Sequence, residues 1–384
     1  MMPLQHAELK PGIAQPESTT APAPKKTALR IHELDGLRGL LALMVVCYHL
    51  YGSLQSVRDL LHDKLVILTQ AWYAVDVFFL MSGFVMMHVY GRTFSEGAGV
   101  KSFFKFMWAR VARLYPVHVF AMTAMLLIML PVLYREPELY AWQGRYSLGA
   151  YFGSLLMLHG PWMDYRSWNY PAWSISAEWH AYLLFPLMVP LVARIGRVGA
   201  VLAVIACTLI PLALYLQNLQ PDQYPTNGVL VLLRVFPLFL AGTLMYRIGA
   251  ANWFSSGFAA ALLVLATVVA LSHEQWAPWA VLLAPAMVLS ALSQNWFQSV
   301  LRRPLLLFFG KISYSMYMTH ALVETMIVLI CRVARRYFQL DIAADINLAF
   351  PLWASGIVLA VVVGYFVWRW VEEPARKWVM GLKT

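Results

Sequence analysis

The chain has 384 residues, of which 60% are hydrophobic and 12% charged, whereas a typical soluble domain is about 25% charged. This composition, with 15 Trp, 20 Phe and 19 Tyr, excludes an ordinary water-soluble protein and is typical of an integral membrane protein with aromatic belts. The net charge of +10 does not indicate a nucleic-acid partner, because the basic residues lie mostly at the ends of apolar segments, where topology and contact with lipid headgroups or phosphorylated ligands explain them.

Residues 1–30 are rich in Pro, Ala, Thr and Gln and contain no apolar core, so we expect a disordered cytoplasmic tail. Residues 31–378 should form one membrane domain, followed by a short cytoplasmic tail at 379–384. A spanning helix needs about 20 mostly apolar residues. The sequence therefore predicts an all-α, polytopic membrane helical bundle, with about ten transmembrane helices at 36–56, 68–90, 108–133, 174–193, 198–217, 229–247, 255–272, 277–294, 312–332 and 347–371.

An eleventh apolar patch, at about 147–160, is too short to cross comfortably, and we interpret it as a re-entrant or interfacial segment. The distribution of Arg and Lys then predicts the orientation. With the N-terminus inside, two outer loops (218–228 and 273–276) hold no Arg or Lys, and one outer loop, with Arg332, Arg335 and Arg336, is an exception. We expect a multi-pass inner-membrane protein with both termini cytoplasmic, since the basic residues of the inner side are Arg92, Lys101, Lys105, Arg194, Arg197, Arg247, Arg302, Arg303, Lys311, Arg376, Lys377 and Lys383.

The first predicted span, "DGLRGLLALMVVCYH", carries Arg38 and His49. Eleven residues of helix leave them about 20° apart around the axis and about 16 Å apart along it. Arg38 should lie near the cytoplasmic surface and His49 near mid-membrane. Histidine acts as a general base near neutral pH, so this pair suits an anionic donor that enters from inside. The alternatives are a snorkelling anchor for Arg38 and a structural role for His49.

The second and third spans contain further charged residues. Asp76, in "YAVDVFFLMSGF", either orients His49 or is the structural partner of an arginine. Arg110 and Arg113, in "WARVARLYPVH", share one helical face. Guanidinium forks match phosphate oxygens, so the pair predicts a phosphate site beside Arg38, although positive-inside anchoring alone explains one of the two.

The fourth span, "PAWSISAEWHAYLLFP", places Glu178 on one face with Ser174 and Tyr182, at i−4 and i+4. Glu178 either binds acceptor hydroxyls, assists proton transfer, or belongs to a structural network. His180 points to the opposite face and is interpreted as structural.

The ninth span, "ISYSMYMTHALVE", has a polar stripe of Ser313, Tyr317, His320 and Glu324. Such a stripe lines either a helix–helix seam or a cavity. Three cysteines (Cys47, Cys207 and Cys331) lie inside apolar runs with spacing that suits neither a disulfide framework nor a metal site, and we predict no metal.

Six blocks, in order, resemble the acyltransferase family 3 of membrane proteins, whose members O-acylate lipopolysaccharide O-antigens, exopolysaccharides, Nod factors, peptidoglycan and macrolides. The blocks are "LDGLRGLLALMVVCYH", "VDVFFLMSGFVM", "RVARLYP", "WSISAEWHAYLLFP", "SYSMYMTHALV" and "VEEPARKW". The resemblance covers about residues 30–378 and identifies 31–378 as the acyltransferase membrane domain. Met81, His180 and Thr319 depart from the family pattern, where Leu or Val, an aromatic residue and Trp are expected, which leaves the acceptor open.

The resemblance implies an acyl-CoA co-substrate, most often acetyl-CoA, with no tightly bound cofactor. It also implies an acceptor hydroxyl on a carbohydrate or lipid-linked glycan, or on a related surface or secreted acceptor. Carried over to this sequence, it makes His49 the catalytic histidine and three arginines essential. We predict His49, Asp76 and Glu178 as catalytic, Arg38, Arg110 and Arg113 as donor-binding, and Ser174, Tyr182, Tyr317 and His320 as substrate-binding.

Two other classes of function remain possible from the sequence. A proton-coupled transporter would use Asp76, Glu178 and His320 as a relay, and would show inverted repeats and broken helices, of which the sequence gives no clear sign. A non-catalytic scaffold in polysaccharide export would leave the aligned pair in the first span unexplained.

Overall fold

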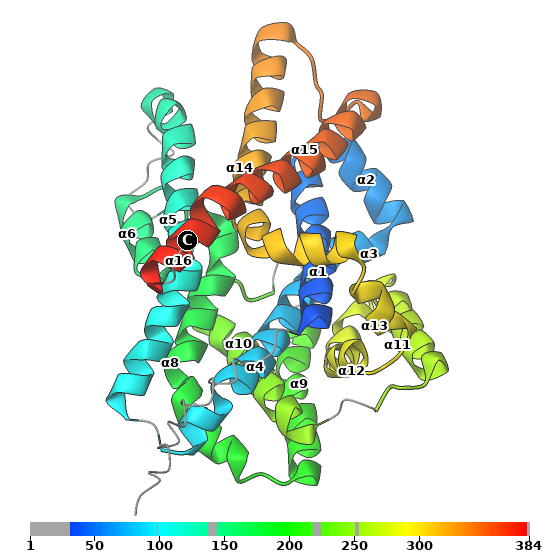
Figure 1. Ribbon diagram of the computed structural model, residues 1–384. Helices are drawn as coiled ribbons and strands as arrows, with labels where there is room; N and C mark the ends of the chain where they lie inside the picture. Colours follow the sequence, from blue (N-terminus) through cyan, green and yellow to red (C-terminus); the bar gives the residue numbers. More distant parts are fainter. Residues whose placement is uncertain (1–30, 98, 137–143, 218–223, 250–252, 382–384) are drawn as a thin grey trace, which may run out of the picture. The chain divides into compact units, whose positions relative to one another are not determined.

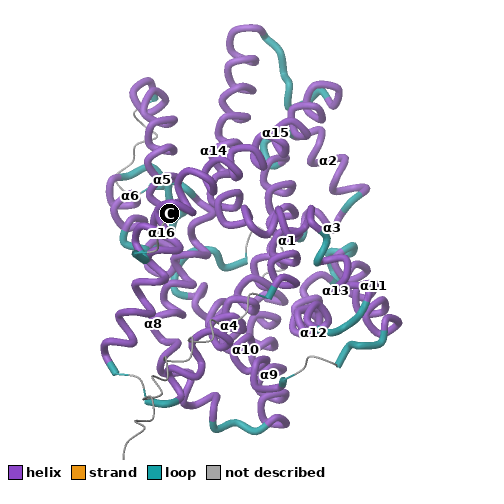
Figure 2. The backbone as a smooth tube through the Cα atoms, viewed as in Figure 1, coloured by secondary structure: helices purple, strands orange, loops and turns teal. Residues whose placement is uncertain are grey.

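The structure is a computed structural model that describes residues 31–97, 99–136, 144–217, 224–249 and 253–381. Within these ranges all regular elements are helices (Figure 2), which confirms the all-α prediction. The tail expected at 1–30 lies outside the described residues, as do residues 382–384 of the second predicted tail.

Each of the ten predicted spans coincides with a helix (Figure 1). Among the described residues, eight helices are long and apolar enough to cross a membrane, and two shorter apolar ones correspond to the seventh and eighth predicted spans. The chain is therefore a multi-pass integral membrane protein. The eight long helices are α1 (His32–Tyr51), α4 (Trp72–Ser95), α5 (Val100–Arg135), α8 (Trp173–Ala193), α9 (Arg197–Gln217), α10 (Leu230–Ile248), α14 (Pro304–Phe338) and α15 (Ile346–Val367).

The remaining helices are short and connect or extend the long ones. The two shorter apolar helices are α11 (Gly257–Leu271) and α12 (Ala280–Leu292), the latter preceded by the 3₁₀ turn η4 (Ala277–Trp279). The others are α2 (Gln55–Lys64), α3 (Val66–Thr69), α6 (Leu148–Leu155), α7 (His159–Trp162), the 3₁₀ turn η2 (Tyr170–Ala172), α13 (Trp296–Leu301), the π-helical turn η5 (Trp368–Glu372) and α16 (Glu373–Val379).

Local signals explain where several helices begin and end. The patch predicted to be re-entrant or interfacial forms α6 and α7, and neither helix is long enough to cross a membrane. Ser147 caps α6, its hydroxyl accepting a hydrogen bond from the Ala150 amide at 3.0 Å. Pro304 occupies the first turn of α14, where its missing N–H costs nothing. Gly249 ends α10 at φ 64°, the left-handed conformation that glycine adopts without strain.

Glycines allow α1 and α14 to approach closely along the helices that carry the predicted site (Figure 1). A Cβ atom on Gly39 would lie 2.5 Å from the Gly310 amide nitrogen, and one on Gly310 would overlap the Asp35 carbonyl. Gly83 and Gly242 make the same kind of approach between α4 and α10. Small residues at helix crossings let backbones pack in contact inside a membrane, so these crossings fix how the polar residues of neighbouring helices face one another.

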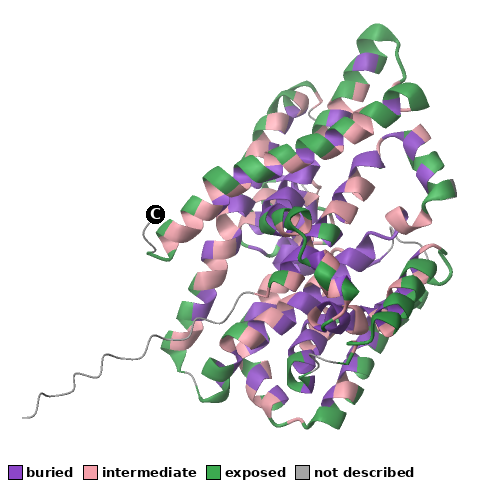
Figure 3. Cartoon of the chain, turned by 45° about the vertical axis from the view of Figure 1, so that its right-hand side comes forward, coloured by how far each residue is buried: buried purple, intermediate pink, exposed green. Residues whose placement is uncertain are grey.

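Burial separates the interior of the bundle from its outer faces (Figure 3). On α15, Val358, Leu359 and Val362 are 63%, 47% and 42% exposed, as expected of apolar side chains that face lipid. After α15 the backbone passes through the π-helical turn η5, and Glu372 at the end of this turn is buried. Single π-helical turns are frequent at functional sites, and this one brings a carboxylate to the interior.

Candidate active site

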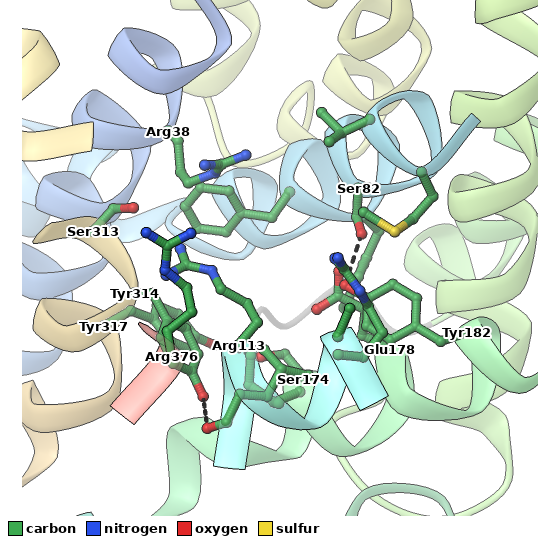
Figure 4. Close-up of a pocket in the computed structure, with 18 of the residues that line it drawn as sticks. Arg38, Ser82, Arg113, Ser174, Glu178, Tyr182, Ser313, Tyr314, Tyr317 and Arg376 are labelled. Carbon is green, nitrogen blue, oxygen red and sulfur yellow. Dashed lines mark hydrogen bonds between the residues drawn. The ribbon is translucent and has the colours of Figure 1, made fainter. Parts of the chain in front are cut away.

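Arg38 and His49, both on α1, line different cavities. Arg38 lines a cavity of about 430 Å³ between α1, α4, α5, α8 and α14, with α16 contributing one side (Figure 4). His49 lines two small cavities of about 110 and 100 Å³. Val75 and Tyr317 line both the large cavity and one of the small ones. The two ends of the predicted site therefore belong to adjoining spaces separated by the Val75 and Tyr317 side chains.

Four arginines and one glutamate are the charged residues that line the large cavity. Figure 4 shows Arg38, Arg113 and Arg376 extending toward it from different elements. The Arg38 Nη1 atom donates to Asp35 Oδ1 at 3.2 Å within the same helix. Arg376, which sequence reasoning did not single out, donates from Nη2 to Glu373 Oε2 at 2.8 Å.

Arg110 and Arg113 differ in their partners although they share a helical face. Arg110 Nη2 donates to the Tyr90 hydroxyl at 3.2 Å, and the guanidinium lies between 5.4 and 5.8 Å from the ring centres of Tyr90, Phe106 and Tyr182. Within the described residues it forms no salt bridge. Cation–π contacts of this kind hold a guanidinium in place. Arg110 also interacts electrostatically with Glu178, which lines the same cavity, so its charge is only partly balanced and faces the cavity.

Arg113 forms an ion pair with the buried Glu372. The Ser315 hydroxyl donates to the other oxygen of this carboxylate at 2.5 Å, and the Arg113 guanidinium lies 5.2 Å from the Tyr314 ring centre. The segment "VEEPARKW" was recognised in the sequence, but no role was predicted for Glu372. A π-helical turn changes which residues share a helical face, so an ordinary helical periodicity does not predict that this carboxylate points inward.

Side chains with hydroxyl and carboxyl groups, mainly from α8, line another part of the large cavity. Ser174, Glu178 and Tyr182 all line the large cavity, as one face of α8 allows. The Glu178 carboxyl lies beside the Ser82 and Tyr182 hydroxyls, which are 3.1 Å from each other. Elsewhere on this cavity the Ser174 and Tyr317 hydroxyls form a 2.8 Å hydrogen bond, visible in Figure 4. The structure thus brings these residues together without testing their predicted roles.

His49 has a defined hydrogen-bonding arrangement. Its Nδ1 lies 2.9 Å from the Val45 carbonyl oxygen. A carbonyl oxygen only accepts, so Nδ1 carries the proton and Nε2 of the neutral ring keeps its lone pair. The His320 ring centre lies 4.9 Å away and the Tyr170 ring centre 5.2 Å away. His49 thus presents an unprotonated nitrogen among polar aromatic side chains.

Residues from loops and short helices complete the two small cavities. Arg166 and Thr226 line both of them, and Asn227 lines one. His159, from α7, is 2% exposed and its ring stacks on that of His118 with 6.1 Å between centres. Burial lowers the pKa of His159 to about 3, so this side chain is uncharged at neutral pH. Sequence reasoning missed these residues, because hydropathy identifies spans and says little about the loops that fold between them.

Asp76 lies in a buried network with Arg234, which lines one of the small cavities together with His49. Its Oδ1 accepts from Arg234 Nε at 2.8 Å, its Oδ2 accepts from the Tyr215 hydroxyl, and both ionic side chains are 0% exposed. Arg234 also donates to the Trp72 and Pro225 carbonyls, each at 3.1 Å. Of the two interpretations of Asp76, pairing with an arginine is the one that these contacts favour, and its catalytic role stays a prediction. Arg234 itself was a visible signal, a lone charge in a predicted span, that sequence reasoning passed over.

Comparison with known proteins gives a family. A family model described as an acyltransferase domain matches residues 31–369. The chain is 31% identical over 181 residues to Acyltransferase MdmB of Streptomyces mycarofaciens. The matched region covers 44% of this chain and 41% of that protein. It is 40% identical over 92 residues to Protein 2 in picA locus of Rhizobium radiobacter, covering 24% of this chain and 42% of that protein.

The chain thus spans about two fifths of the length of both curated relatives. No solved structure matches. The family model covers most of the chain, including the residues of α1, α4, α5, α8 and α14 that line the three cavities. The resemblance noted in the sequence is therefore confirmed, and this chain belongs to the acyltransferase 3 family.

Proposed function

We propose that this protein is a membrane O-acyltransferase that moves an acyl group, in the first instance acetyl, from acyl-CoA to a hydroxyl of a carbohydrate or related surface or secreted acceptor. One observation carries the proposal. A cavity lined by four arginines adjoins a smaller cavity that holds His49, and the two share Val75 and Tyr317. Family membership supports acyl transfer as the reaction.

The large cavity suits the donor. Its volume of about 430 Å³ falls within the range of small-molecule sites. Arg38, Arg110 and Arg113, joined by Arg376, would bind the phosphates of CoA, since guanidinium groups match phosphate oxygens in charge and geometry. The apolar Val75 and Phe78 side chains would line the path of the thioester toward His49. The excess of Arg and Lys in the predicted inner loops supports entry of the donor from the cytoplasm.

His49 would act as the general base. Its Nε2 removes the proton of the acceptor hydroxyl as that oxygen attacks the thioester carbonyl carbon. The tetrahedral intermediate then collapses with cleavage of the C–S bond, and the CoA thiolate leaves with the proton from the His49 imidazolium. A positioned base of this kind contributes typically 10²- to 10⁴-fold to the rate.

The small cavities would receive the acceptor hydroxyl. Both are lined by His49 together with Tyr48, Trp173 and Thr226. Aromatic faces and hydroxyls of this kind suit a hydroxyl-rich ligand whose C–H surface packs on a ring while its polar groups form hydrogen bonds. We infer that five further residues contact substrate or position the side chains that contact it. They are Ser174, Glu178, Tyr182, Tyr317 and His320.

The transporter alternative gains no support from the geometry. Asp76 is paired with Arg234, Glu178 lines the large cavity, and His320 contacts His49. The three groups of the hypothetical relay thus lie in three different environments. No described contact joins them in series.

Turnover by the purified protein tests the proposal. Wild-type protein given acetyl-CoA should release CoA thiol, slowly with water as acceptor and faster with a glycan extract. His49→Ala should lower the rate by about 100-fold or more while the protein stays inserted and folded. His62→Ala, which changes an exposed histidine paired with Glu274, is the matched control and should keep the wild-type rate. Near-normal turnover by His49→Ala would contradict the assignment.

A further inference from the structure

Two histidines from different helices, His49 beside the small cavities and His320 behind it, have the same hydrogen-bonding pattern. His49 Nδ1 donates to the Val45 carbonyl at 2.9 Å, and His320 Nδ1 donates to the Tyr317 carbonyl at 2.6 Å. Both rings therefore keep Nε2 as the free nitrogen. Their centres lie 4.9 Å apart with the planes tilted by 36°. His320 is 0% exposed, so whatever else polar it contacts must come from the protein or a ligand.

A tyrosine and a glutamate continue this pair on the far side of His320. The Tyr170 hydroxyl lies 3.4 Å from His320 Nε2 and donates to Glu324 Oε2 at 2.6 Å. Tyr170 also contacts the His49 ring directly, with 5.2 Å between ring centres. Tyr170 belongs to η2, and His320 and Glu324 lie one turn apart on α14. The four side chains come from three separate elements and meet at one point of the fold.

Glu324 is held by Tyr170 and lies within the field of two arginines. Within the part of the chain that the structure describes, it forms no salt bridge, and its hydrogen bond is the one from Tyr170. Arg145 and Arg166 are the basic side chains whose positive charges act on it. It lines none of the cavities described above. A carboxylate in a spanning helix is costly, and holding Tyr170 alone would need only a neutral acceptor, so its place beside the contact between Tyr170 and His320 points to a further role.

We propose that Tyr170 and Glu324 are positioning residues for His49, acting with His320 to hold the ring and to stabilise the imidazolium that forms during transfer. This inference rests on the proposed function, in which His49 takes the acceptor proton. The short Tyr170–Glu324 hydrogen bond fixes the hydroxyl beside His320 and the Tyr170 ring beside His49. The carboxylate then places a negative charge near the point where positive charge develops, the arrangement that preorganised electrostatic stabilisation requires.

A purely structural seam between η2 and α14 would have the same contacts, so the test must separate the two roles. Glu324→Gln keeps the shape and an acceptor for Tyr170 but removes the charge. Tyr170→Phe removes a single hydroxyl and serves if Glu324→Gln fails to fold. Thr325→Val and Tyr151→Phe are matched controls, since Thr325 donates to the Ala321 carbonyl one turn earlier and to the Met125 sulfur of α5, and Tyr151 packs on Phe152 and Trp168.

The readout is steady-state release of CoA thiol from acetyl-CoA, with water as acceptor, by the full-length protein. We expect Glu324→Gln and Tyr170→Phe each to lower kcat by about 10- to 100-fold, with KM for acetyl-CoA unchanged, because neither residue lines the donor cavity. The double variant should be no slower than the worse single one, since groups that act as a unit are not additive. The controls should stay within about twofold of wild type in kcat.

Three results would overturn the inference while leaving the proposed function intact, provided that His49→Ala still abolishes turnover. These are a kcat within about threefold of wild type in both single variants, a rise in KM with kcat retained, or losses that multiply in the double variant. Failure of the wild-type protein to exceed His49→Ala would instead refute the proposed function, and the inference with it.

Discussion

Replacing Asp76 distinguishes a structural role, as the partner of Arg234, from a catalytic role of its carboxylate. In Asp76→Ala, Arg234 keeps its two backbone carbonyl acceptors and its contacts with the Trp173 and Tyr215 rings, but its charge has no counterion in a site that is 0% exposed. Breaking a buried pair in this way costs about 3–5 kcal/mol. With an unfolding entropy of about 2.1 cal/mol/K per residue over the chain, this corresponds to a fall in Tm of about 4–6 °C.

Asp76→Ala combined with Arg234→Met should recover much of that loss, because replacing both ions with apolar groups removes the uncompensated charge. The assay is the fraction of purified protein that remains monodisperse after heating, together with acetyl-CoA turnover. Recovery of Tm and turnover together would support the structural role. A double variant that is no more stable than Asp76→Ala would refute it, and one that is stable but inactive would show that the pair does more than stabilise the fold.

Three further changes test the cavity and the packing. Glu372→Gln should lower Tm by a few degrees and raise KM for acetyl-CoA several-fold, because Arg113 loses its ionic partner; an unchanged KM would exclude a positioning role for this carboxylate. Arg376→Gln should raise KM about tenfold with little change in kcat, and a loss confined to kcat would count against phosphate binding. Gly310→Val should prevent the close approach of α1 and α14 and reduce the yield of folded protein, whereas Gly196→Ala, where a Cβ would meet nothing within 4 Å, should leave Tm unchanged.

The sequence predicted the helices well because spans are set by a local property, the length of an apolar run. The two shorter helices, α11 and α12, differ only in length from the spans predicted at 255–272 and 277–294. Helix ends were less predictable. Helix α14 begins at Pro304, well before the span predicted from residue 312. The prediction began the span after Lys311, a basic residue that was counted with Arg302 and Arg303 on the inner side, although the residues just before it are apolar.

The sequence did not predict which side chains of different helices contact one another in the site. The pairing of Asp76 with Arg234 joins positions 158 residues apart, and the hydrogen bond between Tyr170 and Glu324 joins positions 154 apart. Periodicity places residues on a face of one helix but says nothing about which helix lies opposite. The shared face of Ser174, Glu178 and Tyr182 was therefore predictable, whereas the role of Glu372 depended on a π-helical turn.

Measuring acyl-CoA binding and turnover in the same variants is the most direct test, because donor binding and acyl transfer are proposed to occur at opposite ends of α1. The protein carrying His49→Ala should bind acetyl-CoA with the wild-type Kd by calorimetry and fail to turn it over. Arg110→Gln should weaken binding by about tenfold or more, since this guanidinium lines the donor cavity and, within the described residues, is not held in a salt bridge. Loss of binding in His49→Ala, or wild-type binding in Arg110→Gln, would contradict a donor held by the arginines and transferred at His49.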